Sequence, residues 1–272
     1  MKKLLLICIS LMLCATTYGW SVREHATVAE IAERHLTPKA KKLVTKYLGG
    51  RPMAYYASHA DFFRNEMIVD IGYEAERGKR YVVFPHTYHV DEQHKPYRDI
   101  VKSNGKVFGN MLYHIDRLAK GLKEGHREMN DSVRLTHLYL IIHGVGDMHC
   151  PMHMRFTDHY SLGTYKVYFG KKKLSHHQLW DSHIISSVHP WSYEDMATLF
   201  DIYDKRERED FCKGGLFEWG EDVAKAAYPI HEYSEGAKIN VIEYRRKYQH
   251  VGEQLLTKAG YRLAKMLNDI LK

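Results

Sequence analysis

The stretch HGVGDMHCPMH, residues 143–153, concentrates side chains that bind metal ions. His143 and Asp147 are four residues apart, so on a helix they would lie on one face and could share an ion. Pro151 disfavours helix at the residue before it, and the resulting turn would let His153 swing back toward the same region. Histidine nitrogen and aspartate oxygen are common zinc ligands. The stretch therefore predicts a metal site, although one such pair alone is weak evidence in a chain with 19 histidines.

Two further pairs of residues repeat this kind of spacing. His177 and Asp181 are again four residues apart, on a second predicted helix. In the segment ASHADFFR, Asp61 precedes Arg64 by about one helical turn. An ion pair on a solvated helix face would explain this second pattern equally well.

Histidines also gather in the segment PHTYHVD, where His86, His89 and Asp91 lie in a short extended stretch. A fifth candidate is WSVREH, which contains Trp20 and His25. If the chain is cleaved before Trp20, that residue carries an α-amino group with a pKa of ~7.7–8.0, which can deprotonate and bind a metal.

Residues 1–19 have the pattern of a secretory signal peptide. Lys2 and Lys3 precede an apolar run over residues 4–13, and Thr17 and Gly19 could occupy the −3 and −1 cleavage positions. The run is shorter than the ~20 residues that a membrane-spanning helix requires. We therefore expect an exported protein, in the periplasm or outside the cell, with cleavage before Trp20.

A lipoprotein anchored through Cys14 is a less favoured alternative, because Leu13 is a poor residue immediately before a lipidated cysteine. Cleavage before Trp20 removes Cys8 and Cys14 and leaves Cys150 and Cys212, which could form a disulfide or remain two separate thiols. Loss of Lys2 and Lys3 would lower the formal net charge from +7 to +5. This mild basicity favours a phosphate or polyanion substrate.

The apolar pattern predicts an all-α protein with one small β-hairpin, organised as a single domain over residues 20–272. The hydrophobic content of 44% is sufficient for a core. Thr37 and Pro38 are suited to open a helix that Gly49 and Gly50 would close. Further helices are expected over residues 23–36, 132–149 (capped by Asp131), 176–188 (capped by Ser175) and through the C-terminal third from Trp191, with the hairpin over residues 164–174.

The order of these motifs resembles the S1/P1 nuclease family, zinc-dependent relatives of bacterial phospholipase C. The shared stretches are WSVREHATVAEIA, ASHADFFR, HLYLIIHGVGDMHCPMH and LWD, and they cover nearly the whole length after residue 19. The resemblance implies a helical domain of the phospholipase C/P1 nuclease type and three zinc ions. The implied metal ligands are Trp20, His25, Asp61, His89 or His86, His143, Asp147, His153, His177 and Asp181.

The resemblance also implies how these residues divide their work. Asp147 would bridge two zinc ions, and a hydroxide shared by these ions would attack phosphorus. Asp61, Arg64 and Asp147 are the catalytic residues, with Arg64 facing the phosphate. The implied substrates are single-stranded DNA or RNA and 3′-nucleotides, with no stable membrane association and no protein partner.

The sequence departs from the family pattern in two places. The family has His-aromatic-aliphatic-Asp/Asn at its second histidine, and we favour His89 over His86 because Val90 and Asp91 then keep their place. The aromatic residue that stacks a base is absent after either histidine. Cys150 replaces the family glutamine before the proline, and it could be an added ligand or a buried thiol. Four tyrosines could stack a base instead: Tyr55, Tyr56, Tyr88 and Tyr160.

Two other functions remain open at this point. One is a phospholipase C-like hydrolase on the same scaffold, which Asp181 disfavours because the phospholipases resemble one another in having glutamate there. The other is a non-catalytic protein that binds zinc for stability, since structural zinc sites are closed whereas catalytic sites leave a position open.

Overall fold

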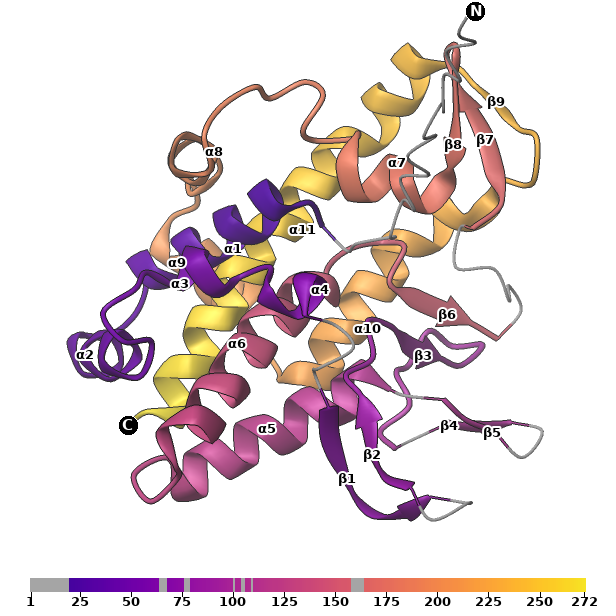
Figure 1. Ribbon diagram of the computed structural model, residues 1–272. Coiled ribbons are helices and arrows are strands. Elements are labelled where there is room, and N and C mark those ends of the chain that lie inside the picture. Colours follow the sequence, from indigo (N-terminus) through magenta and orange to yellow (C-terminus); the bar gives the residue numbers. More distant parts are fainter. Residues whose placement is uncertain are drawn as a thin grey trace, which may run out of the picture.

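The computed structural model describes residues 20–63, 68–75, 79–99, 101–103, 106–108, 110–157 and 164–272. Helices dominate this part of the chain, and strands are short and lie mainly on one side (Figure 1). The predicted helical class is therefore confirmed. None of the described helices combines the length and apolar character needed to cross a membrane.

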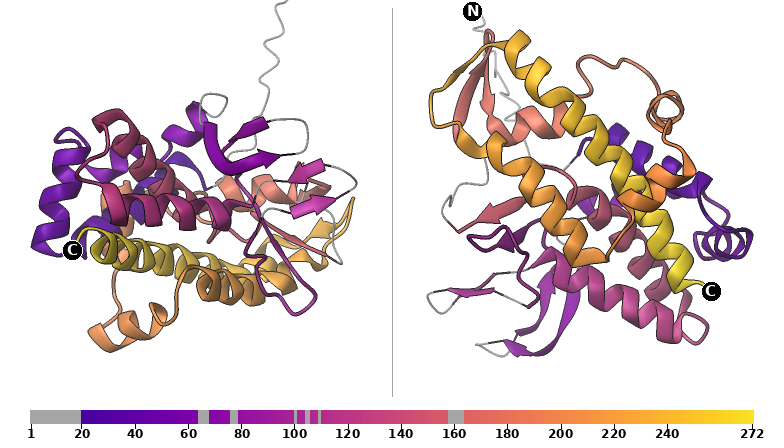
Figure 2. Two further views of the ribbon diagram at one scale, coloured as in Figure 1. Left: turned by 90° about the horizontal axis from the view of Figure 1, so that it is seen from below. Right: turned by 180° about the vertical axis from the view of Figure 1, so that it is seen from behind.

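The longest helix, α11 (Val241–Ile270), runs across the molecule and packs against α1 (Val22–Arg34) (Figures 1 and 2). Gly260 lies at this crossing. A β-carbon there would lie 2.5 Å from Ile31 Cγ2 and 3.2 Å from the Val28 carbonyl oxygen. The two helix backbones approach so closely because this position has no side chain.

Helix α6 (Asp131–Asp147) forms a helical hairpin with α5 (Met111–Gly125) and also contacts α1 and α11. From Leu138 to Asp147, every residue of α6 is buried. This half of the helix is apolar on all sides except for His143 and Asp147, as expected of a central helix. Its N-cap is Asn130, whose side chain accepts a hydrogen bond from Ser132 N, so the predicted cap at Asp131 is wrong by one residue.

Two other predicted caps are confirmed. The Thr37 side chain accepts from Ala40 N at the start of α2 (Pro38–Tyr47), and Ser175 forms a capping box with Gln178 at the start of α7 (His176–Ser182). Helix α7 ends six residues earlier than the predicted 188. The remaining helices are α3 (Met53–Tyr56), α4 (His59–Phe62), α8 (Tyr193–Phe200), α9 (Lys205–Phe211), α10 (Leu216–Ala227) and a 3₁₀ helix (Tyr228–Glu232).

The predicted hairpin is confirmed as β7 (Lys166–Phe169) and β8 (Lys172–Ser175), joined at Gly170, with β9 (Lys238–Ile239) parallel to β7. The sequence predicted one β segment, whereas the structure has more. Three further pairs are β1 (Ile68–Ala75) with β2 (Lys79–Val83), β3 (Tyr88–Val90) with β6 (Met154–Phe156), and β4 (Val101–Ser103) with β5 (Lys106–Phe108).

The two cysteines of this part of the chain do not form a disulfide. Cys150 is buried and free, and Cys212 is partly buried and free. Of the two alternatives left open by the sequence, the structure therefore has two separate thiols.

We predict that Gly260→Ala lowers the stability of the fold. The added methyl group would overlap Ile31, and overpacking of this kind costs ~1–3 kcal/mol. The free energy of unfolding, measured by urea titration, should fall by this amount. Gly125→Ala is the matched control, because a β-carbon at the end of α5 meets nothing within 4 Å, and it should be neutral or slightly stabilising. Equal stability of the two variants would contradict the close approach of α1 and α11.

Candidate metal centre

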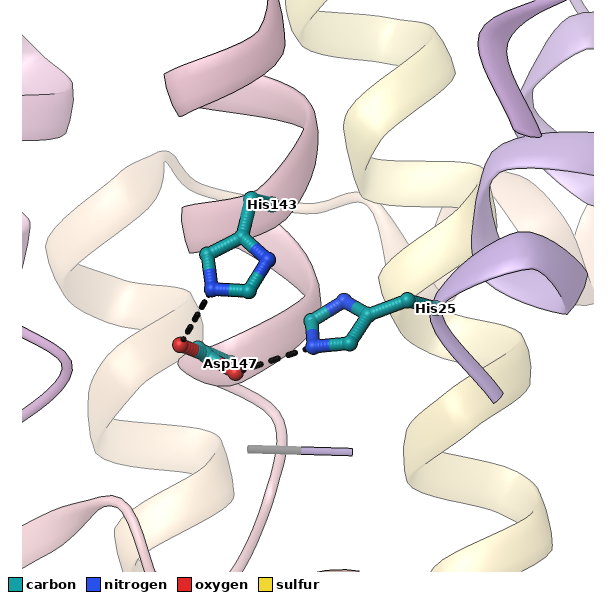
Figure 3. A group of neighbouring side chains, drawn as sticks. All are labelled: His25, His143 and Asp147. Atoms are coloured by element: carbon teal, nitrogen blue, oxygen red, sulfur yellow. Dashed lines mark ion pairs between the residues drawn. The ribbon is translucent and has the colours of Figure 1, made fainter. Parts of the chain in front are cut away.

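The site is built around Asp147, whose side chain is completely buried at the end of α6. Its two carboxylate oxygens face different partners (Figure 3). Oδ1 lies 3.2 Å from His25 Nε2, and Oδ2 lies 3.0 Å from His143 Nε2. His25 comes from α1, so the carboxylate lies between two helices that are far apart in sequence.

Two glycines allow other elements to approach this end of α6. A β-carbon at Gly146 would lie 2.7 Å from His25 Nδ1, and one at Gly144 would lie 3.0 Å from both Ile115 and Phe84. The His25 ring can therefore stack on the His143 ring, with centroids 4.3 Å apart. Substitution at either glycine would push away a neighbour that the site needs.

Asp147 Oδ2 forms a first set of four donor groups with His86, His143 and Asp61. His86 Nδ1 lies 2.7 Å from this oxygen and 3.5 Å from His143 Nε2. Asp61 Oδ1 lies 3.6 Å from both His86 Nδ1 and His143 Nε2. Ligands at ~2.0–2.1 Å from a tetrahedral zinc ion are ~3.4 Å apart. The spacing of these four groups therefore fits one metal ion, with a small outward movement of His86.

The structure brings His86, and not the favoured His89, into this set. In β3 the side chains of Tyr88 and Val90 point into the core, so His89 between them points the other way, as alternation in a strand requires. Burial and the charge of Arg155 lower the pKa of His89 to about 4. No group of metal-type ligands among the described residues includes His89. His86 rather than His89 therefore lies among the other candidate ligands, which the family spacing, read without regard to the strand, did not indicate.

Pairing of β3 with β6 places His86 beside the turn after α6. Tyr88 N donates to the carbonyl oxygen of His153 at 3.1 Å, and Tyr88 is aligned with Met154. This parallel pairing brings the two histidine segments together although they are about sixty residues apart. His86, Asp147 and His153 form another group whose ligand atoms lie within 4.8 Å of one another.

A separate set of donors lies where the turn after α6 meets α7. His177 Nε2 is 3.0 Å from His153 Nε2 and 3.1 Å from Asp181 Oδ2. His153 Nε2 is 3.7 Å from Asp181 Oδ1. The structure brings these three predicted residues together, and His153 and Asp181 also form a metal-type group with Cys150 whose ligand atoms lie within 4.8 Å of one another.

Cys150 adjoins this second set, with its thiol 3.6 Å from Asp181 Oδ1. Burial and the charge of Asp181 raise the pKa of the thiol well above its usual range. The group is therefore a thiol that donates a weak hydrogen bond to Asp181. Burial in turn raises the pKa of Asp181 to about 8, so this carboxyl group also favours a neutral form when no cation is near.

Several buried polar atoms of the site form no hydrogen bond with the described residues. They are both ring nitrogens of His25, Nδ1 of His153, Oδ1 of Asp147 and Oδ2 of Asp181. A buried polar group without a partner costs ~1–3 kcal/mol. Orphaned nitrogen and carboxylate oxygen atoms that converge on common points are a donor set suited to zinc. The residues present therefore fit metal ions.

Protons partly fill the role of cations when no metal ion is bound. Burial lowers the pKa of His143, but Asp147 and Asp61 outweigh it and the net pKa is about 9. His153 behaves in the same way, with a pKa of about 10. Burial raises the pKa of Asp147, but His143 and His153 overcome it and hold the pKa well below the usual range. Metal binding would therefore have to displace protons from both histidines.

Hydrogen bonds to backbone carbonyl oxygens hold the histidine rings of this stretch in place. His143 Nδ1 donates to the carbonyl oxygen of Ala57 at 2.9 Å, which leaves Nε2 directed at Asp147. His149, in the middle of the same stretch, has another role. Its Nδ1 donates to the Val145 carbonyl oxygen, and its Nε2 accepts from Arg262 at 3.0 Å. His149 therefore holds α6 to α11 and lies outside the metal-type groups.

Trp20 is completely buried. The following residue, Ser21, donates from its backbone N to the carbonyl oxygen of Asp181 at 2.8 Å. Glu24, 1% exposed, accepts hydrogen bonds from the hydroxyl groups of Ser21 and Ser186. These contacts, which no sequence pattern predicted, attach the start of α1 to α7 and to the segment that follows it.

The remaining candidates are Arg64 and the tyrosines proposed to stack a base. Arg64 and Tyr160 lie outside the described residues. Tyr88 is buried, with its hydroxyl donating to the Gly220 carbonyl oxygen, so it cannot stack a base. Exposed aromatic side chains near Asp61 are Phe62 (62%), Phe63 (46%) and Tyr55 (51%). Phe62 and Phe63, which directly follow Asp61, were not among the predicted candidates.

The fold and the site define a mostly helical protein whose buried histidine and aspartate groups could bind metal ions. A model of the S1/P1 nuclease family matches residues 20–272, and the chain belongs to this family. Nuclease S1 of Aspergillus oryzae is 25% identical over an alignment of 283 positions, which covers 96% of this chain and 95% of that protein. Endonuclease 2 of Arabidopsis thaliana is 21% identical over 268 residues, with coverage of 93% and 91%.

We predict that His86→Ala lowers the metal content of the purified protein, whereas His89→Ala does not. His86 lies among the donor groups around Asp147. His89 lies on the face of β3 opposite to the buried side chains of Tyr88 and Val90. Elemental analysis of both variants after equilibration with zinc provides the measurement, with His89→Ala as the matched control. Loss of metal from His89→Ala alone would show that the segment binds in the other register.

Proposed function

We propose that the protein is a zinc-dependent phosphodiesterase that cleaves single-stranded nucleic acid and 3′-nucleotides. The observation that carries this proposal is that the two carboxylate oxygens of Asp147 face different sets of donor groups. One oxygen faces His143 and His86, and the other faces His25. A carboxylate in this position can hold two ions close together, and paired ions are a common device for phosphoester hydrolysis.

Each ion would be held by its own set of residues. Asp61, His86, His143 and Asp147 would hold the first, and His153, His177 and Asp181 another. His25, Asp147 and the amine and carbonyl of Trp20 would hold the one beside the first. When bound, the zinc ions supply Lewis acidity that lowers the pKa of water and neutralises charge on a phosphate.

The protein's own residues position these groups and exclude water. Ala57 fixes the His143 ring, and the buried end of α6 keeps Asp147 away from solvent, so its charge acts over a short range without screening. Arg64 is the residue proposed to face the phosphate, on the basis of the family resemblance. The roles of Asp61 and Asp147 are to hold and align metal ions beside that phosphate.

Nucleic acid is favoured as substrate by the names of the two relatives and by the exposed aromatic side chains beside Asp61. Base–aromatic stacking contributes ~1–3 kcal/mol per base, and Phe62 and Phe63 are the aromatic side chains nearest in sequence to Asp61. A phospholipase C-like activity remains the second candidate, because the scaffold is shared. Aspartate rather than glutamate at position 181 favours the nuclease.

We also propose that the protein is exported and begins at Trp20. The hydrogen bond from Ser21 N to Asp181 and the buried carboxylate of Glu24 hold this end of α1 at the site. A chain that continued before Trp20 would have an amide in place of the amine. The lipid-anchored form through Cys14 would therefore lose a proposed ligand.

The purified mature protein should hydrolyse single-stranded DNA, with activity abolished by a chelator and restored by zinc. Asp147→Asn should lower kcat at least ~10³-fold, the upper end of the loss when one electrostatic group is removed from an active site. Asp116→Asn on the surface of α5 is the control and should be fully active. Hydrolysis of phosphatidylcholine without hydrolysis of DNA would favour the second candidate. Zinc binding without any phosphoester hydrolysis would indicate a structural role.

Edman degradation of the exported protein should give Trp20 as the first residue. The mature form should then bind close to three zinc ions, whereas a form with one extra residue before Trp20 should bind fewer, because the amine is displaced. Elemental analysis of the two forms measures this difference. A lipidated Cys14 as the first residue would exclude the proposed ligand.

A further inference from the structure

A basic hollow lies between α2 and the loop that joins α5 to α6, a region that the proposed metal sites do not use. Its volume is about 360 Å³. The seven lining residues include five cations and no carboxylate: Lys39, Lys42, Leu43, Lys46, Tyr47, Arg127 and Arg134. We refer to this surface as the basic groove.

Three lysines form one wall of the basic groove. Lys39, Lys42 and Lys46 are three and four residues apart, so they share one face of α2, whereas Lys41 lies on the other side. Like charges at this spacing destabilise a helix, and a lysine in the first turn also opposes the helix dipole. Helix α2 has no acidic residue in its first turn to offset this. An anion in the groove would relieve both effects.

The floor of the basic groove is rigid. Arg134, 7% exposed, donates from Nε to the His126 carbonyl oxygen at 2.5 Å and from Nη1 to Asp131 at 2.5 Å. Its guanidinium group lies 4.4 Å from the centre of the Tyr47 ring, and the Tyr47 hydroxyl is 2.8 Å from His126 Nδ1. The floor is thereby fixed in place without any ligand.

The remaining cations are available to a ligand. Asp131 pairs with Arg134, and within the described part of the chain Lys39, Lys42, Lys46 and Arg127 form no ion pair. They are all exposed, so their charge faces solvent. A row of lysines along a groove is the arrangement that tracks the phosphates of a single strand.

We propose that the basic groove binds the phosphate backbone of a single-stranded nucleic acid at a distance from the cleavage site. The inference rests on the proposed function and adds to it a preference for long strands. Helix α6 connects the two regions, since Arg134 lies near its start and Asp147 at its end. The helix rise of 1.5 Å per residue separates them by ~20 Å. A strand of about six nucleotides at a stacked spacing of ~3.4 Å covers this distance.

The test compares two triple variants with the same change in charge. In the first, Lys39, Lys42 and Lys46 are each replaced by glutamine. In the second, Lys171, Lys172 and Lys173 of the β7–β8 hairpin are replaced by glutamine. The hairpin and α2 lie at opposite ends of the molecule (Figures 1 and 2). Steady-state hydrolysis of a dinucleotide and of a 30-nucleotide DNA strand is measured, together with binding of the labelled strand by fluorescence anisotropy.

We expect the groove variant to lose at least ~10-fold in kcat/KM on the 30-nucleotide strand and in its affinity, with the dinucleotide unaffected. Loss of three phosphate contacts should also reduce the slope of log affinity against log salt by about 2. The hairpin variant should behave as the wild type in all three measurements. A length series should show the difference only above about six nucleotides.

Three results would overturn the proposal. Unchanged binding of the long strand by the groove variant would show that the groove takes no phosphates, and equal losses in both triple variants would show that only net charge matters. Loss of binding to phosphatidylserine vesicles with unchanged strand binding would assign the groove to a membrane surface. Anisotropy is recorded with a chelator present, so the labelled strand stays intact and failure of the proposed nuclease activity would leave the binding result interpretable.

Discussion

The burial of the Asp147 carboxylate is the constraint on which the rest of the site depends. A carboxylate with no exposure to water is unfavourable by several kcal/mol unless cations and hydrogen bonds compensate it. His25 lies on one side of it and His86 and His143 on the other. In the absence of metal, protons on His143 and His153 supply the charge, which is why the pKa values of these two histidines are about 9 and 10. Each compensating group comes from a different segment, so the fold has to bring these segments to one point.

Several features of the fold serve this convergence. The end of α6 is buried on all sides. A side chain at Gly146 would keep His25 at a distance, and one at Gly144 would keep Phe84 at a distance. The β3–β6 pairing joins the His86 segment to the turn that carries His153. The backbone hydrogen bond from Ser21 N attaches the start of α1 to Asp181 on α7. The strands are therefore minor in number of residues but decisive for the site.

The sequence predicted those parts of the molecule that depend on local pattern. The period of apolar residues located the main helices, and the oxygen atoms of Thr37 and Ser175 were recognised as caps because capping requires only neighbouring residues. The spacing of four between His143 and Asp147, and between His177 and Asp181, likewise needs only a helix. The choice between His86 and His89 depended on the phase of a three-residue strand whose partner lies more than sixty residues away. Short strands of this kind have little local signal, and the family pattern favoured the histidine that lies away from the other candidate ligands.

The two ends of α6 show opposite solutions to the handling of charge. At the C-terminal end, three aspartates are buried among histidines, where the low dielectric makes every charge act strongly on its neighbours. At the N-terminal end, Arg134 is tied to Asp131 and to backbone oxygens, and the four other cations of the basic groove face solvent. A buried cluster of fixed geometry suits chemistry on one phosphate, because positions there must be accurate. An open groove of solvated lysines suits attraction of many phosphates regardless of sequence, because such contacts tolerate movement and are screened by salt. One rigid helix between the two would keep a bound strand in register with the site that cleaves it.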